Sequence, residues 1–266
     1  MEMKSLTSIP GSILTKISKK NMSIESMLRA ANRSPRVVVG LACLCLAEPA
    51  AVTAWEALHG ALGVNPLEIL MREPGKWSLI LLLLALAVAP LRHGLVSFCI
   101  STQQSFGKRV ADWNWLIRLR RPIGLASFFY AVAHGAIYAY FDLDMNPGEF
   151  IEDLRNKPYI ALGTVAFIIL VPLAITSTDG WMRRLKRKWK RLHLLVYPAA
   201  LLAEGHFVLL SKPGVIDPYL YGIVLFLLVG YRAIQAWQRG FVLQDRVDGT
   251  LPERGQRHEK QPVSAA

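Results

Sequence analysis

This chain has few cysteines and shows no targeting signal and no internal repeat. None of its three cysteines stands in a C-x-x-C-H sequence, which excludes covalent attachment of a c-type haem. We expect all three to be small, buried, apolar side chains, namely Cys43, Cys45 and Cys99. Residues 1–36 are polar and basic and do not read as a cleavable signal peptide. The absence of a repeat, direct or inverted, argues against the common transporter architectures.

Apolar residues are abundant. They make up 53% of the 266 residues, and the mean hydropathy is +0.31, more than a soluble domain usually carries. We predict an all-α, polytopic membrane protein, a bundle of six transmembrane helices, because six segments approach the roughly 20 residues that a bilayer requires. They are Val37–Ala57, Trp77–Leu91, Pro122–Phe141, Tyr159–Thr176, Leu192–Leu210 and Tyr219–Ala236. Glu48-Pro49 interrupts the first segment, so five spans are the alternative.

The net charge of +12 would suit a nucleic-acid partner, but the distribution of the cations argues against one. All but five of the 31 lysines and arginines fall on one side of the predicted spans; the exceptions are Arg72, Lys76, Arg155, Lys157 and Lys212. This asymmetry predicts that both termini are cytoplasmic. Residues 1–36 then form a cytoplasmic tail, 37–237 the six-helix domain, and 238–266 a disordered cytoplasmic tail.

Two basic connections are predicted on the cytoplasmic side. Residues 92–121 hold tryptophans amid cations, and we expect them to form an interfacial helix on the inner leaflet. Residues 181–191, WMRRLKRKWKR, have the same character. Both are expected to attract anionic lipid headgroups, and docking of a soluble electron donor is the alternative.

Three histidines lie inside or beside apolar spans, where ionisable side chains are expensive and usually functional. His134 and His206 each fall 13 residues after the basic start of an outward-running helix, about 19 Å along its axis. At this matched depth they could bind one haem iron from opposite faces, since neutral imidazole is a good axial ligand. The competing interpretation is that each forms a helix–helix hydrogen bond.

His193 would serve a second haem near the cytoplasmic boundary, but its partner is not evident. Arg121 lies at the matching level of the third span; it cannot bind iron and could instead pair with a haem propionate. His93, at the end of the second span, is the other candidate partner. His193 and His206 are about 140° apart on an ideal helix, so both face the interior only if the helix is distorted, and Pro198 lies between them.

Two acidic residues also fall within predicted spans. Glu204 lies two positions before His206 and therefore points away from that imidazole on a regular helix. It could transfer protons or stay protonated and hydrogen-bonded. Glu48 could take part in quinone chemistry, or simply belong to an irregular part of the first span.

Three strings carry a family resemblance: RRPIGLASFFYAVAHGAIYAYFD, KPYIALGTVAFIILVPLAITSTDGW and WKRLHLLVYPAALLAEGHF. Over about residues 76–237 the chain resembles the haem-binding membrane subunits of bacterial protein-methionine-sulfoxide reductase systems (the MsrQ family, formerly YedZ). These belong with the ferric-reductase-like transmembrane domains. The resemblance implies haem b, one or two per chain, with axial ligands at His134, His193 and His206. FMN is also associated with the family, although no flavin motif is legible here.

The resemblance further implies a non-catalytic electron-transfer subunit. Electrons would come from the quinol pool or a cytoplasmic flavin reductase. They would leave to a periplasmic molybdopterin enzyme that reduces methionine sulfoxide in oxidised proteins. No dehydrogenase module follows the last span, so a flavin partner is expected to be a separate protein. Arg121 stands at about the position where the wider oxidases have a second histidine. A standard second haem site with two histidine ligands is therefore in doubt. The alternatives are a membrane ferric or metal reductase and a proton-linked transporter using His134, Glu204 and His206.

Overall fold

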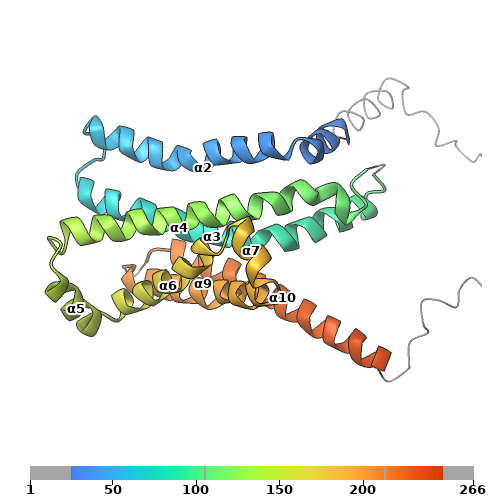
Figure 1. Ribbon diagram of the computed structural model, residues 1–266. Coiled ribbons are helices and arrows are strands. Elements are labelled where there is room, and N and C mark those ends of the chain that lie inside the picture. The colour runs from blue at the N-terminus through green and yellow to red at the C-terminus, as the bar shows by residue number, and fades with distance from the viewer. Residues whose placement is uncertain (1–24, 105, 213, 248–266) are drawn as a thin grey trace, which may run out of the picture. The chain divides into compact units, whose positions relative to one another are not determined.

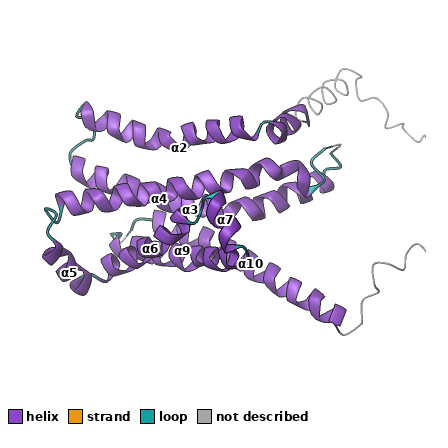
Figure 2. Ribbon diagram, in the orientation of Figure 1, coloured by secondary structure: helices purple, strands orange, loops and turns teal. Residues whose placement is uncertain are grey.

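A computed structural model describes residues 25–104, 106–212 and 214–247, and all regular structure in these ranges is helical (Figures 1 and 2). The chain separates into residues 1–225 and 226–266, which we describe individually. The long helices are α2 (Pro35–Leu58), α3 (Pro66–Ser101), α4 (Asn114–Phe141), α6 (Pro158–Ile175), α9 (Val196–Leu210) and α10 (Asp217–Val247). The short elements are η1 (Val110–Trp113), α5 (Pro147–Asn156), α7 (Asp179–Leu185), α8 (Arg187–Leu192) and η2 (His193–Leu195).

Within the described residues six helices are long and apolar enough to cross a membrane, which confirms the six-span prediction over the five-span alternative. The first of them, α2, continues through Glu48-Pro49. The second, α3, has 36 residues and extends well beyond the predicted Trp77–Leu91 at both ends. The last, α10, runs to Val247, into the predicted C-terminal tail; residues 248–266 of that tail and 1–24 of the N-terminal tail lie outside the described ranges.

Within residues 1–225 the helices associate as two close pairs, α3 with α4 and α6 with α9, and α2 packs on α4. The core lies along α3, whose LILLLLALAV run is apolar on every side and therefore suits a surrounded helix. Ser78 and Ser127 fasten α3 to α4 reciprocally, because each hydroxyl donates to the carbonyl of the other residue, at 2.9 and 2.8 Å. Phe128 and Phe167 stack between α4 and α6, with ring centroids 5.9 Å apart.

Tyr130 compensates for the proline in α2. Pro49 lacks an N–H and disturbs the helical ladder around it. The Tyr130 hydroxyl, from α4, donates to the carbonyl of Leu46 at 2.9 Å and accepts from the N–H of Ala50 at 3.0 Å. This hydroxyl satisfies two backbone groups that water cannot reach within a bilayer, so the helix continues where the sequence suggested an interruption.

The predicted interfacial helix at residues 92–121 takes another form. Residues 92–101 prolong α3 and residues 114–121 begin α4, and a short turn with η1 connects the two helices. In this turn Gly107 adopts φ +74°, and a Cβ there would lie 2.9 Å from the Sγ of Cys99. Cys99 is buried as expected, but Cys43 and Cys45 are exposed on α2, so that expectation was wrong for two cysteines: their helix presents them on its uncovered surface.

Candidate functional site

His134 of α4 and His206 of α9 meet in the structure. Their ring centroids are 6.0 Å apart and their planes are inclined at 73°. Each ring is half-buried between helices of the two pairs. The structure thus brings together the two imidazoles that the sequence places at one depth.

The same hydrogen bond orients both imidazoles. The Nδ1 of His134 lies 2.8 Å from the carbonyl oxygen of Met71 in α3, and that of His206 lies 2.7 Å from the carbonyl oxygen of Tyr159 in α6. Because a carbonyl only accepts, each Nδ1 must carry the proton and donate. The lone pair of each neutral ring is therefore on Nε2, the arrangement in which histidine binds a metal.

A glycine makes room for each ring. A Cβ at Gly75 would lie 3.0 Å from the Nδ1 of His134, and one at Gly163 would lie 2.8 Å from the Nδ1 of His206. Each glycine stands four residues, one helical turn, after the carbonyl that accepts the hydrogen bond. The two histidines are thus held alike, each against the glycine face of the helix paired with its own.

This donor set fits the axial ligands of a haem iron. His134 and His206 would hold the group between them, because their ring centroids are 6.0 Å apart and the Nδ1 of each ring is already bonded to a carbonyl, which leaves Nε2 for the group. The bonds from Nδ1 to the carbonyls are the helix–helix hydrogen bonds of the competing interpretation, and they are also the outer bonds that metal-bound histidines usually make. Among the described residues there is no group of three or more His, Cys, Asp or Glu that could hold a bare metal ion. Two neutral imidazoles are nevertheless sufficient for haem, because the porphyrin supplies the other ligands.

His193 occupies a separate position. It begins η2, its Nδ1 is 3.3 Å from the carbonyl oxygen of Trp189, and its ring stacks on that indole at a centroid distance of 4.0 Å. Its Nε2 is buried and makes no hydrogen bond to the described part of the chain. The backbone of Leu173, in α6, lies close to the ring.

Comparison with known proteins identifies the family. Residues 74–203 match the model of the ferric reductase like transmembrane component. The chain is 45% identical over 179 residues to the protein-methionine-sulfoxide reductase haem-binding subunit MsrQ of Xanthomonas campestris pv. campestris (strain B100), covering 67% of this chain and 73% of the relative. It is 38% identical over 185 residues to the subunit of the same name from Herminiimonas arsenicoxydans, covering 68% and 78%. The chain belongs to the MsrQ family.

The resemblance seen in the three sequence strings is therefore confirmed, and within this MsrQ-family chain the strings become specific elements. The first string forms the C-terminal part of α4 and contains His134. The second includes α6 and Tyr159, whose carbonyl accepts the hydrogen bond from His206. The third contains His193 in η2 and His206 in α9. The distortion between the last two histidines is the 3₁₀ turn η2. Pro198 is the third residue of α9, and the carbonyl four residues before it belongs to Leu194 in η2, so the proline is compatible with the distortion of that turn, as the sequence suggests.

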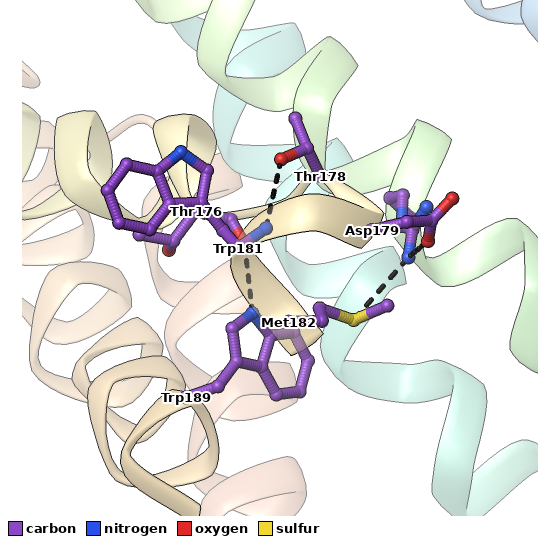
Figure 3. Close-up of polar contacts among 7 residues, drawn as sticks. Thr176, Thr178, Asp179, Trp181, Met182 and Trp189 are labelled. Carbon is purple, nitrogen blue, oxygen red and sulfur yellow. Dashed lines mark hydrogen bonds and ion pairs between the residues drawn. The ribbon is translucent and has the colours of Figure 1, made fainter. Parts of the chain in front are cut away.

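Arg121 and His93, the two candidate partners of His193, are placed elsewhere. The guanidinium of Arg121 donates to Asp179 Oδ1 at 2.7 Å and lies 3.4 Å from the Sδ of Met182, both in α7 (Figure 3). The bond from Arg121 lowers the pKa of the Asp179 carboxyl, so this pair is ionised at neutral pH. His93 is half-buried in α3 and makes no hydrogen bond or ring contact with other described residues.

The two acidic residues within spans differ in burial. Glu48 is exposed on α2. Glu204 is 7% exposed, and neither of its carboxyl oxygens has a hydrogen-bond partner among the described residues. Its Oε1 lies 3.2 Å from the Cβ position of Gly222, in α10. Glu204 thus points toward α10 while His206 points toward α4 and α6, as the two-residue spacing requires.

Sequence reasoning missed the residues that support the imidazoles. Met71 and Tyr159 act through their backbone carbonyls, which leave no trace in residue identity. Gly75 and Gly163 left a weak signal, since each stands within six residues of a proline near the start of a span. Only the structure shows that each glycine lies against a histidine from another helix.

Proposed function

We propose that this chain is a b-type cytochrome, an electron-transfer subunit that carries electrons across the bacterial inner membrane. The observation that carries the proposal is the pair His134 and His206, 6.0 Å apart with both Nδ1 atoms bonded to carbonyls. Haem, when bound there, supplies one-electron chemistry. The six candidate spans and the name of the relatives, haem-binding subunits of protein-methionine-sulfoxide reductase, support the same conclusion.

In this proposal the chain's own residues supply ligands, orientation and exclusion of water. The carbonyls of Met71 and Tyr159 fix the tautomer of each ligand and make its Nε2 more basic. His193, with its buried and unpartnered Nε2, is the ligand we assign to a second haem. Arg121 forms an ion pair with Asp179, so a role for Arg121 at a haem propionate would require that ion pair to open.

The direction of transfer follows from the proposed topology. The excess of cations on one side supports cytoplasmic termini, which places His134 and His206 in the outer half of the membrane and His193 near the cytoplasm. Electrons would enter from a quinol or a cytoplasmic flavin reductase and leave to a periplasmic molybdopterin methionine-sulfoxide reductase. FMN is a further candidate cofactor, to which the described residues assign no site.

A reduced-minus-oxidised spectrum of the detergent-purified protein, with haem quantified as the pyridine haemochrome, tests the assignment. We expect a sharp low-spin b-type α-band, lost at the outer site in His206→Ala. His59→Ala is the matched control, because His59 is exposed at the end of α2 and stacks only on Trp55. Full haem content and an unchanged spectrum in His206→Ala would refute the assignment of this ligand.

A membrane ferric reductase is the second candidate, favoured by the match of residues 74–203 to the ferric-reductase-like component. The two functions share the haem sites and differ in the electron acceptor. Membranes that contain this chain and no methionine-sulfoxide reductase should leave ferric chelates oxidised if the first proposal is correct. Rapid reduction of those chelates would favour the second.

A further inference from the structure

Seven cations crowd the connection between α6 and α9, and we call them the basic platform: Arg183, Arg184, Lys186, Arg187, Lys188, Lys190 and Arg191. All seven are exposed, and none forms a salt bridge with a described residue. The one acidic residue in this connection, Asp179, is bound by Arg121. The platform therefore presents a dense positive charge that the described chain leaves largely uncompensated.

Two polar contacts hold the platform at the ends of the membrane spans. The indole Nε1 of Trp189 donates to the carbonyl of Thr176, the residue that follows α6, at 2.9 Å (Figure 3). The Arg121–Asp179 ion pair joins α7 to α4. Between these two anchors Lys186 adopts φ +47°, which ends α7 and starts α8 in a new direction. These contacts tie the backbone that carries the cations to the end of α6 and to α4.

Apolar side chains beside the platform are also exposed. The exposed fraction is 56% for Ile175, 39% for Trp181, 59% for Leu194 and 40% for Leu195. The guanidinium of Arg184 lies 5.7 Å from the centroid of the Trp181 ring. Exposed aliphatic and indole groups next to cations are typical of a protein surface in the headgroup region, where the rings contact acyl chains and the cations contact phosphates.

We propose that the basic platform binds the phosphates of anionic phospholipids, such as phosphatidylglycerol, in the leaflet that it faces. The charge is complementary, and the anchors keep the cations in the plane of the headgroups. The exposed Trp181, Leu194 and Leu195 favour a lipid over a soluble acidic protein, because exposed apolar side chains beside cations suit the boundary between headgroups and acyl chains. The proposal does not depend on haem or on the direction of electron transfer.

Lipid binding would act directly on the His193 turn. Lys188 and Lys190 flank Trp189, whose ring stacks on His193. Phosphates held by these lysines restrain α8, and α8 restrains the stacked imidazole. Anionic lipid is therefore a structural partner of the region around His193 as well as a surface contact.

Native mass spectrometry of the purified protein in detergent, with phosphatidylglycerol or phosphatidylcholine added, tests the proposal. The test variant is Arg183→Gln/Arg187→Gln/Lys190→Gln. The matched control removes three exposed cations from the opposite ends of the spans, Arg72→Gln/Arg155→Gln/Lys212→Gln. At about fivefold in affinity for each cation near a surface, we expect the loss of three cations to weaken binding of phosphatidylglycerol by roughly a hundredfold. The control should bind like the unaltered protein.

The salt dependence of binding to the unaltered protein is a second measurement that requires no variant. We expect the preference for phosphatidylglycerol over phosphatidylcholine to fall as sodium chloride is raised from 0.05 to about 0.5 M, because ions screen exposed charges. Equal binding of both lipids at low salt, or undiminished phosphatidylglycerol binding in the test variant, would overturn the proposal. If that variant instead kept its lipid and lost reduction by a soluble donor protein, the platform would be a protein-docking surface.

Discussion

Replacing Gly163 by alanine should displace one of the two paired imidazoles. The new Cβ would lie 2.8 Å from Nδ1 and 3.2 Å from Cε1 of His206, where ordinary contacts begin near 3.4 Å. The ring must therefore retreat by about 0.6 Å or rotate. Either movement weakens the 2.7 Å hydrogen bond to the carbonyl of Tyr159. Loss of such an outer-shell partner typically lowers metal affinity by about 10- to 100-fold, roughly 1.4–2.7 kcal/mol.

The assay is the haem content of the purified variant, with the low-spin electron paramagnetic resonance signal and the midpoint potential measured on the same sample. Gly75→Ala should have a smaller effect, since its Cβ would lie 3.0 Å from the Nδ1 of His134. Gly135→Ala is the control, because nothing lies within 4 Å of its Cβ position although it adjoins His134 in sequence. Unchanged haem content, signal and potential in Gly163→Ala would show that the glycine has no part in holding the ligand.

Two further predictions concern stability. Tyr130→Phe removes the hydroxyl that bonds Leu46 and Ala50, so thermal unfolding in detergent should show that the free energy of unfolding falls by about 1–3 kcal/mol. Tyr140→Phe, at an exposed tyrosine, is the control. Equal effects of the two substitutions would contradict the role of the Tyr130 hydroxyl at the proline of α2. A hydrogen bond from Lys157 and a weaker contribution from Tyr138 lower the pKa of Asp153 in α5. The ionised carboxylate therefore stabilises the fold fully above the usual aspartate pKa, and this stabilisation is lost as the pH falls through the lowered pKa. In Asp153→Asn the free energy of unfolding should fall less steeply as the pH is lowered through this range. An unchanged pH dependence would contradict the assignment.

The number of spans and the matched depth of His134 and His206 could be predicted from sequence, because both rest on fixed quantities. The bilayer sets the length of an apolar segment, and the helix sets a rise of about 1.5 Å per residue. The ends of α3 could not be predicted in this way. Hydropathy falls at Glu73 and Lys76 and again at Arg92, but the backbone hydrogen bonds that continue a helix do not depend on hydropathy, and α3 runs through all three positions.

The local departures from ideal helices could be predicted only in part. An ideal helix puts His193 and His206 about 140° apart, and proline is the usual sequence signal for a correction. The structure places the correction in η2, in the turn that precedes Pro198, and this tighter turn begins at His193 itself. Likewise, the pairing of Arg121 with Asp179 depends on how α7 folds back toward α4. Its sequence signal is only Thr178, which caps the N-terminus of α7 by accepting from Trp181 N–H.

The arrangement of helices explains why the two proposed ligands come from α4 and α9. Each imidazole is oriented by the helix paired with its own, His134 by α3 and His206 by α6, so each close pair holds one proposed ligand by itself. The distance between the imidazoles then depends on the packing between the pairs, where Phe128 and Phe167 stack. A group bound by both histidines joins the two pairs across this contact. Binding of haem by both histidines would therefore be coupled to helix packing, and a substitution at the stacked rings should alter the geometry of the proposed haem site without changing either proposed ligand.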